Sequence, residues 1–364
     1  MGKMKKILIA DWLDKYGGAE RVLSVLNEHY TFYRCYTLIN IMSKEDLKKV
    51  FKNKQVEIIE SNLKVLKSKF RYLFFLFPYF MSSFDSVDEE ALIISSSFSV
   101  AKGFRKKKNQ IHICYYQARN QRYIWDTENI YFSTIIKIVL FPLLYILRKI
   151  DINQSKSPDY IIANSNFVKK WIKENYKLDS SVIYPPVDTK YQIQKQTDYF
   201  ITTARLEPYK RVDLLIKAFN KTNESLYVVG DGSIKKQLKK ISNQNIKFFD
   251  FLEPEGVMDL VSKAKAFLHA GIEDFGIAPV EAQSCGTPVI AYNKGGISET
   301  VIHEKTGILF DSQSTSAILD ALNRFKEVEF DYKLISAHAS QFSEQNFVKN
   351  MSKFVLSSLN KAEE

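Results

Sequence analysis

The sequence is poor in cysteine. Only three of its 364 residues are cysteines, Cys35, Cys114 and Cys285, and they stand far apart without forming a CxxC pair. Disulfide-stabilised secreted domains and zinc-binding modules need several closely spaced cysteines, so this pattern argues against both. It is typical of a protein of the reducing cytosol.

No hydrophobic run of the sequence predicts a membrane-spanning helix. Two apolar stretches, YLFFLFPYFM at 72–81 and TIIKIVLFPLLYIL at 134–147, each contain a proline, and both are shorter than the roughly 20 residues that cross a bilayer. Basic residues flank them: Lys67, Lys69 and Arg71 beside the first, and Lys137, Arg148 and Lys149 in or after the second. This pattern predicts segments that lie in the interface of an anionic membrane. The alternative is two core helices with solvated basic ends.

The opening KMKKILIAD has a basic start, but its apolar run before Asp11 is only about five residues long, too short for a signal peptide. We expect a buried first strand there.

Several binding signatures are also missing. The chain has no GxGxxG fingerprint, which argues against a nicotinamide enzyme. Lys and Arg number 52 against 41 Asp and Glu, a net charge of +11, which favours a negatively charged partner. Without a helix-turn-helix, an RNA-binding aromatic signature or a metal finger, nucleic acid is not expected. An anionic membrane or a phosphorylated small molecule remains.

Short β-rich runs alternate with amphipathic helical patterns along the whole chain. The predicted strands of the first half are KILIA, VEIIE, ALIISS, HICYYQ and YIIANS, and those of the second half are YFITTA, SLYVVG, IKFFDFL, AKAFLHA and PVIAY. Near-continuous apolar strands separated by helices predict parallel sheets covered on both faces. The Pro185-Pro186 pair starts the best linker candidate. We therefore expect two doubly wound α/β domains at 1–185 and 198–343, a linker at 186–197 and a last helix at 344–364.

Ligands of doubly wound sheets bind at the carboxyl ends of the strands, so the loops there are the candidate sites. DWLDKYGGAER follows the first strand, and Gly17 and Gly18 could let backbone N–H groups approach an anion or a sugar. A Gly-Gly turn is equally common without a ligand. In VVGDGS, Gly230 and Gly232 could do the same, although a plain strand-to-helix turn also explains them.

TARLEPYKRVD follows the first strand of the second domain. Arg205 and Lys210 bracket a tight turn ahead of a helix, and two such cations are well suited to a diphosphate. The alternative is two solvated basic residues in a loop.

EDFGIAPVE, from Glu273 to Glu281, places two carboxylates eight positions apart. Pro279 suits the first turn of a helix, and Glu281 is then expected near the third helical position, where the helix dipole favours a carboxylate. That accounts for Glu281 by structure alone but not for Glu273, which precedes the Gly276 turn. Carboxylates at the mouth of one loop could accept hydrogen bonds from sugar hydroxyls.

With these segments in order, the chain resembles the retaining, nucleotide-sugar-dependent glycosyltransferases of family 4. The resemblance covers nearly the whole length, through GGAER, ANS, VIYPPVD, ARLEPYKRVDLLIKAF, VVGDG, EDFGIAPVEAQSCGTPVIAY, GGISETV and TGILF. EDFGIAPVE is similar to the specific glutamate-x7-glutamate signature of the family. The forms YPPVD, PYKRVD and EDFGIAPVEAQ, with RYIWD at 122–126, look closest to the mannosyltransferase branch that builds bacterial O-antigen and capsule units. The resemblance implies the GT-B fold, with two Rossmann-like domains facing across a cleft and a last helix crossing back to the first domain.

The resemblance also implies roles for individual residues. Arg205 and Lys210 would hold the donor diphosphate and stabilise the charge that develops on it as it leaves, and Glu273 would bind hydroxyls of the transferred sugar. Glu281 would hold the ribose hydroxyls. The remaining donor-binding residues would be Gly17, Gly18, Gly230, Gly232, Phe275, Gly276 and Ile277. No cofactor and no metal are expected.

One segment departs from the family pattern. The histidine that usually precedes an Arg-Tyr pair, counted back from Arg122 and Tyr123, is replaced by Ala118 in CYYQARNQRYIWD. The segment offers Gln117, Arg119 and Arg122 as sugar or acceptor contacts in its place. His112 lies earlier and is expected inside a strand.

Two functional readings remain open. The first is a hexosyltransferase, with mannose from GDP-mannose or another nucleotide sugar as donor and a polyprenyl-diphosphate-linked glycan as acceptor, working on the cytoplasmic face of the cell membrane. The second is a catalytically weak GT-B protein that only binds sugar nucleotides, which Ala118 would favour. Epimerisation shares the fold but is not favoured by these motifs.

Overall fold

The computed structural model describes residues 4–52, 55–86, 89–119, 121–125, 133–250 and 252–363. Contacts divide the chain into two compact units. The first contains Met1–Pro186 together with Gln345–Glu364, and the second contains Val187–Glu344. Among the described residues, no helix is both long enough and apolar enough to cross a bilayer.

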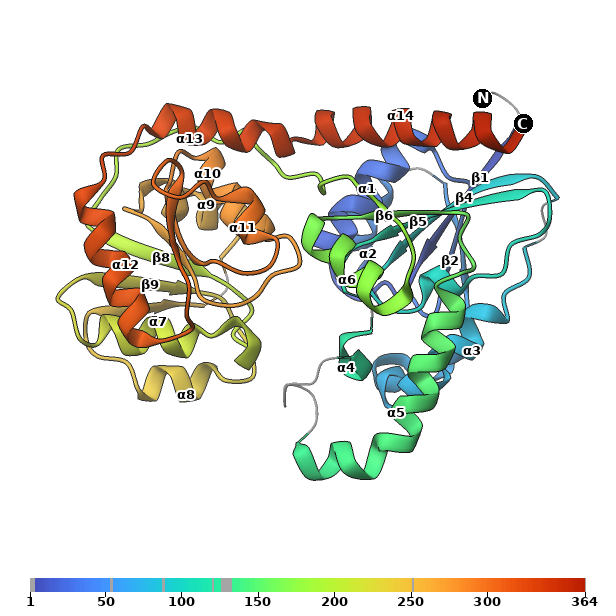
Figure 1. Cartoon of the computed structure of the whole chain (residues 1–364), viewed down its shortest axis with the longest axis horizontal. Coiled ribbons are helices and arrows are strands. Elements are labelled where there is room, and N and C mark those ends of the chain that lie inside the picture. Colours follow the sequence, from blue (N-terminus) through green and yellow to red (C-terminus); the bar gives the residue numbers. More distant parts are fainter. Residues whose placement is uncertain are drawn as a thin grey trace. The chain divides into compact units, whose positions relative to one another are not determined.

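The first unit is built on a parallel sheet of seven strands in the order β3-β2-β1-β4-β5-β6-β7 (Figure 1). The strands are β1 (Lys5–Ala10), β2 (Arg34–Thr37), β3 (Glu57–Glu60), β4 (Ala91–Ser97), β5 (Gln110–Tyr116), β6 (Tyr160–Ala163) and β7 (Ser181–Val182). The helices are α1 (Gly18–Tyr30), α2 (Lys44–Phe51), η1 (Asn62–Leu76), α3 (Phe77–Ser82), η2 (Ala101–Gly103), α4 (Arg122–Trp125), α5 (Thr134–Gln154), α6 (Asn166–Tyr176) and α14 (Glu344–Glu363).

Both faces of this sheet are buried, because successive residues of a strand point to opposite sides. In β1, Leu8 and Ala10 pack with α1, α2 and α14, whereas Ile7 and Ile9 pack with η1 and α3. The last helix is part of this core, since Phe347 lies edge-on against Tyr115 of β5 with 5.7 Å between the ring centroids.

The second unit is built on a parallel sheet of six strands in the order β10-β9-β8-β11-β12-β13. The strands are β8 (Tyr199–Thr203), β9 (Ser225–Val229), β10 (Ile246–Phe249), β11 (Phe267–His269), β12 (Val289–Tyr292) and β13 (Gly307–Phe310). The helices are η3 (Pro208–Lys210), α7 (Val212–Phe219), α8 (Lys235–Lys240), α9 (Pro254–Lys263), α10 (Ile277–Ser284), α11 (Ile297–Thr300), α12 (Thr315–Glu327), α13 (Tyr332–Ala339) and η4 (Ser340–Phe342).

Helices cover this second sheet on both faces as well. One face packs against α7 and α12, and the other against α9, α10 and α11 (Figure 1). The fold predicted from the alternating strands and helices, two doubly wound parallel sheets, is therefore confirmed.

Candidate active site

Each sheet has a topological switch point, where the chain leaves two neighbouring strands in opposite directions. In the second unit these strands are β8 and β11, which are adjacent although they are far apart in the sequence. In doubly wound sheets, ligands bind at the carboxyl ends of the strands at such a point. The loop after β8 carries Arg205 and Lys210, and the loop after β11 carries Glu273.

The structure joins two of these predicted residues directly. The ammonium group of Lys210 forms an ion pair with Oε1 of Glu273. The Nε2 atom of His269, the last residue of β11, lies 3.1 Å from the same oxygen. Lys210 and Glu273 are each about one-fifth exposed, at 18% and 21%. Glu273 is thus a partly buried carboxylate with two basic side chains at one of its oxygens.

These neighbours decide the charge of Glu273. Burial raises its pKa, but the charge of Lys210 and a hydrogen bond with His269 lower it more, so that the pKa lies well below its ordinary value of 4.5. The carboxylate is therefore ionised near neutral pH and has no proton to donate. It is suited to accept hydrogen bonds from hydroxyl groups, and it is unsuited to act as a general acid.

Glycines bring the two loops together. A Cβ atom on Gly271 would lie 2.9 Å from the carbonyl oxygen of Tyr209, so a glycine is needed for the Lys210 turn to pack against the β11 loop. On the other side, the N–H of Gly296 donates a 2.8 Å hydrogen bond to the Glu273 carbonyl. A Cβ on Gly295 would clash with that same carbonyl oxygen at 2.3 Å. These close approaches fix the backbone of Glu273.

Arg205 lies on a second pair of interlocked loops. Gly230 and Gly232 permit close packing there, since Cβ atoms on them would fall 2.0 Å and 2.3 Å from the carbonyl oxygens of Ala204 and Leu206. The Glu207 carboxylate accepts hydrogen bonds from the backbone and hydroxyl of Ser233. Loop packing alone therefore explains why these two positions are glycines. Their contact with a nucleotide-sugar donor remains a prediction.

The Arg205 side chain is exposed and makes no ion pair with any residue that the structure describes. Its guanidinium is therefore available to an anion.

The signature from Glu273 to Glu281 contains a sharp turn and a helix start. Gly276 has φ of +97° and caps α10, and a Cβ there would lie 2.8 Å from Cγ1 of Ile297. Ile277 is the first helical residue and Glu281 lies beyond the first turn, which contains no acidic residue. The expected placement of Glu281 near the third helical position is wrong, because the helix starts two residues before Pro279. Phe275 is buried, with its ring 5.5 Å from that of Phe342.

In the first unit, the switch point lies between β1 and β4. Asp11 follows β1 and is fully buried there. Its carboxylate accepts hydrogen bonds from four consecutive backbone N–H groups after β4, those of residues 98–101, at 2.5–2.9 Å. Burial raises the pKa of Asp11, and these hydrogen bonds and Lys102 oppose that rise. Gly17 and Gly18 are exposed at the start of α1, and Gly17 caps it without a side-chain hydrogen bond.

The segment that follows β5 lies beside the start of α1. The side-chain amide of Gln117 donates to the Ala19 carbonyl at 3.3 Å and to the Ser96 hydroxyl at 2.7 Å, which joins it to the Gly17-Gly18 turn. Arg119 is stacked over the Phe167 ring at 4.9 Å, and Arg122 begins α4.

His112 is buried in β5, as expected, with Nε2 2.8 Å from the Ser95 hydroxyl. Burial lowers its pKa to about 3. Asp126 of RYIWD lies outside the described residues.

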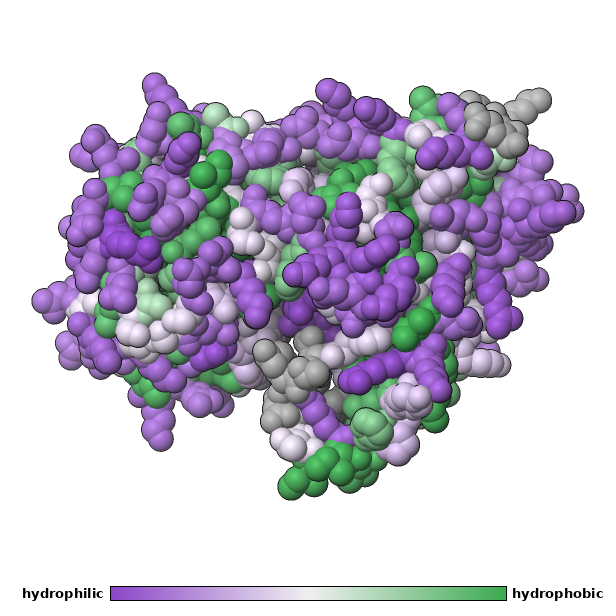
Figure 2. Space-filling view, in the orientation of Figure 1, coloured by the Kyte–Doolittle hydropathy of each residue, from purple (hydrophilic) through white to green (hydrophobic). Residues whose placement is uncertain are grey.

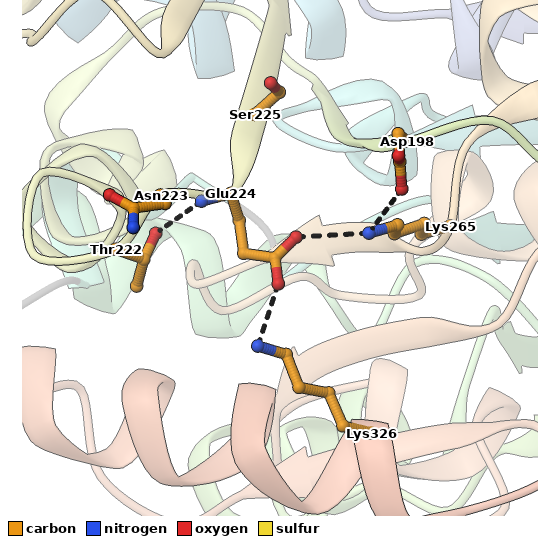
Figure 3. Close-up of a pocket in the computed structure, with 7 residues that line it drawn as sticks. All are labelled: Asp198, Thr222, Asn223, Glu224, Ser225, Lys265 and Lys326. Atoms are coloured by element: carbon orange, nitrogen blue, oxygen red, sulfur yellow. Dashed lines mark hydrogen bonds and ion pairs between the residues drawn. The ribbon is translucent and has the colours of Figure 1, made fainter.

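A pocket of about 540 Å³ opens at the opposite, amino ends of β8, β9 and β11 (Figure 3). Its charged side chains neutralise one another: Glu224 lies 2.8 Å from Lys326 and 3.2 Å from Lys265, and Lys265 also pairs with Asp198 at 2.8 Å. The pocket lies away from the loops of the switch point, and its four charges already have partners. We assign it a structural role.

Two residues at the switch points, His269 and Asp11, are not predicted from the sequence. His269 ends a strand four residues before Glu273, and this spacing in HAGIED was the available signal. Asp11 directly follows the first strand, but a single aspartate after a strand does not reveal that four backbone N–H groups converge on it. Across the described ranges, no group of three His, Cys, Asp or Glu side chains is arranged to hold a metal ion.

Comparison with solved structures agrees with the fold described above. An Anabaena protein solved in complex with UDP superposes with a TM-score of 0.69 at 17% identity, over 97% of this chain and all of that chain. At this identity the likeness shows the fold, which is that of the GT-B glycosyltransferases. Residues 186–345, which contain the Lys210–Glu273 pair, match the family described as "Glycosyl transferases group 1".

Curated relatives match over part of their length. An uncharacterized glycosyltransferase of Methanocaldococcus jannaschii is 27% identical over 51% of this chain and 55% of its own. A GDP-mannose-dependent phosphatidylinositol monomannoside mannosyltransferase of Corynebacterium glutamicum is 30% identical over 35% of this chain and 37% of its own. The chain thus spans about half the length of the first of these relatives and less of the second. Together the matches support a glycosyltransferase family.

Proposed function

We propose that this chain is a retaining hexosyltransferase of family 4 that moves mannose from GDP-mannose to a lipid-linked glycan during bacterial surface polysaccharide synthesis. The observation that carries the proposal is the Lys210–Glu273 pair at the switch point of the second unit, inside the segment that matches the group 1 glycosyl transferases. A nucleotide sugar needs cations beside its diphosphate and a carboxylate that accepts hydrogen bonds from its sugar hydroxyls. These loops offer both.

In this mechanism the bond between the sugar C1 and the diphosphate breaks, and a bond from C1 to the acceptor oxygen forms on the same face. The acceptor proton passes to the departing diphosphate. Arg205 and Lys210 stabilise the negative charge that builds up on that group. Glu273 stays ionised and holds the sugar hydroxyls, with the loop of Phe275, Gly276 and Ile277 beside it, and Glu281 holds the ribose. Neither carboxylate transfers a proton, and no metal takes part.

The mannose donor is favoured by the curated relative that uses GDP-mannose. The second candidate is another nucleotide sugar, which the structural neighbour with bound UDP favours. A weakly active sugar-nucleotide-binding protein is the third, and Ala118 at the usual histidine position favours it.

Thermal-shift measurements with GDP-, UDP-, ADP- and dTDP-sugars would separate these donors, because a ligand that binds the native state raises its melting temperature. We expect GDP-mannose to give the largest shift. The anomeric configuration of the product, read by NMR with EDTA present, would test retention and metal independence. An inverted product would contradict retention. Loss of activity in EDTA that is restored by added metal would contradict metal independence.

We place the acceptor at the inner face of the cell membrane. The net charge of +11 suits both a polyprenyl diphosphate and an anionic bilayer. Transfer to such an acceptor in anionic vesicles, compared with transfer to a water-soluble sugar, would test this placement.

A further inference from the structure

Helix α5 carries an apolar surface that the described structure leaves open to solvent. Its exposed large apolar side chains are Ile135, Ile136, Ile138, Val139, Phe141, Tyr145, Ile146 and Ile150, with exposed fractions from 38% to 76%. Figure 2 shows apolar residues gathered over the lower part of this helix. Water-soluble helices normally expose one polar face, so a helix with so many exposed apolar side chains indicates a binding surface.

The helix has two limbs with different environments. Pro142 stands in its interior, where a proline removes a backbone hydrogen bond, and Figure 1 shows the helix changing direction about midway. All of the buried residues of α5 lie after Pro142: Leu144, Leu147, Asp151 and Gln154. The first limb, from Thr134 to Phe141, is therefore presented outward by a second limb that is anchored in the unit.

Basic residues predominate in the segments that form this surface, although Arg71 is paired with the Asp14 carboxylate. No Asp or Glu occurs between Glu60 and Asp85, or between Glu128 and Asp151. These intervals, which contain η1, α3 and most of α5, carry seven basic residues: Lys64, Lys67, Lys69, Arg71, Lys137, Arg148 and Lys149. An anionic surface complements them, whereas a second copy of this chain would set like charges against one another.

Aromatic residues favour the same partner. Tyr145 of α5 is half exposed, and Tyr72 and Tyr79 of the neighbouring η1 and α3 are 80% and 68% exposed. The η1 segment joins α5 through Phe74, which packs in one cluster with Leu144 and Leu147. Tyrosine rings are amphipathic and prefer the boundary between lipid headgroups and acyl chains.

The anchored limb also holds residues 121–125, which include Arg122, one of the candidate sugar or acceptor contacts. The Asp151 carboxylate accepts hydrogen bonds from Nε1 of Trp125 at 2.6 Å and from the Gln121 side chain, and it forms an ion pair with the buried Lys102 at 2.5 Å. Arg148 donates to the Ile124 carbonyl at 2.6 Å. The position of residues 121–125 is therefore tied to that of α5.

We propose that the exposed face of α5 docks on an anionic bilayer, and that this docking holds the segment Gln121–Trp125 at the membrane surface, where it meets a lipid-linked acceptor. The role given to the acceptor rests on the proposed function, whereas the docking surface does not. The first limb lies in the interface without crossing the bilayer. The basic residues that face the lipid headgroups are the exposed lysines Lys64, Lys67, Lys69 and Lys149.

Flotation with vesicles tests the surface directly. The wild-type chain should float with vesicles of mixed phosphatidylcholine and phosphatidylglycerol, much less with phosphatidylcholine alone, and less at high salt. The variant I138E/V139E places two charges where apolar side chains would enter the interface, and its binding should fall by at least about tenfold. The control L334E/L356E changes two other exposed leucines and should float like the wild type.

Matched melting temperatures and hydrolysis of a soluble nucleotide sugar would show that the I138E/V139E variant is folded and that its donor site is intact. Undiminished flotation of this variant, or a wild-type chain that ignores anionic vesicles, would overturn the proposal. So would a wild-type dimer that the variant converts to a monomer without lipid, because the face would then join two copies. Flotation by a chain without transferase activity would support the docking surface and count against the proposed function alone.

Discussion

Lys210 and Glu273 are 63 positions apart in the sequence and form an ion pair beside the switch point between β8 and β11. His269 is a third member of this cluster, with its Nε2 3.1 Å from the same Glu273 oxygen. The charge of Lys210 and a hydrogen bond with His269 lower the energy of the ionised carboxylate, and the carboxylate in turn holds the ammonium group of Lys210 in place. An anionic donor would meet a lysine that is already positioned.

Replacing Glu273 by alanine should abolish sugar transfer while the fold survives. The loss should be at least about 100-fold in kcat/KM, roughly 3 kcal/mol of transition-state stabilisation, because the sugar hydroxyls lose an ionised acceptor and Lys210 loses its position. Steady-state transfer assays, with circular dichroism as a check of folding, would measure this. The control Glu327→Ala removes an exposed carboxylate from α12 and should change little. Full activity of the Glu273→Ala enzyme would defeat the proposed function.

Replacing Lys210 by methionine should move the acid limb of the pH–rate profile upward. In the native protein the pKa of Glu273 is lowered from 4.5, so the carboxylate remains ionised throughout the mildly acidic range. Without the lysine charge, burial is opposed less strongly and the pKa of Glu273 rises. As the pH is lowered, activity should therefore be lost at a higher pH than in the wild type. Profiles of residual activity would show the shift. Parallel profiles that differ only in height would mean that Lys210 does not set the charge of Glu273.

Gly276→Ala should destabilise the second unit by about 1–2 kcal/mol and weaken donor binding, because a side chain at φ of +97° is strained and would press on Ile297. Gly256 lies in α9, where a Cβ would make an ordinary contact with the Leu252 Cβ at 3.9 Å, and Gly256→Ala should instead stabilise by about 0.5–1 kcal/mol. Urea unfolding of both variants gives the comparison. Equal effects of the two substitutions would contradict the assigned strain.

Asp151→Asn should destabilise the first unit strongly. Lys102 and Asp151 are both fully buried, and removing one partner of a buried ion pair typically costs about 3–5 kcal/mol. The double variant K102M/D151L removes both charges and should recover the part of that loss that comes from the unpaired lysine, while Trp125, Gln121 and Tyr176 still lose an acceptor. Urea unfolding followed by tryptophan fluorescence would measure this, since Trp125 bonds to Asp151. A double variant as unstable as Asp151→Asn would show that lost packing, and not the unpaired lysine, sets the cost.

The pocket around Glu224 should make stability depend on pH. Burial raises the pKa of Glu224, but hydrogen bonds and charges from Lys326 and Lys265 lower it more, so that it lies below 4.5. A lowered folded-state pKa contributes stability above the unfolded value and loses it as pH falls through the folded one. Glu224→Gln should therefore cost about 1 kcal/mol at neutral pH and progressively less below pH about 4.5. Thermal melts across this range, with Glu327→Gln as control, would check it; a constant difference would contradict it.

Much of the fold could be predicted, because a buried strand or an amphipathic helix carries its own apolar pattern. The strands KILIA, ALIISS and HICYYQ are found as β1, β4 and β5. The short β2, with the sequence RCYT, was missed because its polar residues break the apolar run. The start of α10 was placed two residues late because Gly276, and not Pro279, sets it through its positive φ.

The sequence by itself determined two doubly wound sheets and the loops in which Arg205, Lys210 and Glu273 stand. Only the tertiary structure decided that Lys210 meets Glu273 and His269, that Asp11 closes the other switch point, and that Asp151 holds Gln121 and Trp125. The physical reason is that apolar periodicity records local burial, whereas these contacts depend on strand order and on glycines that let distant loops approach. For residues 134–147 the sequence predicts an interfacial helix and leaves a core helix as the alternative, and the packing of the described residues supports the first, because the apolar side chains along α5 stay exposed.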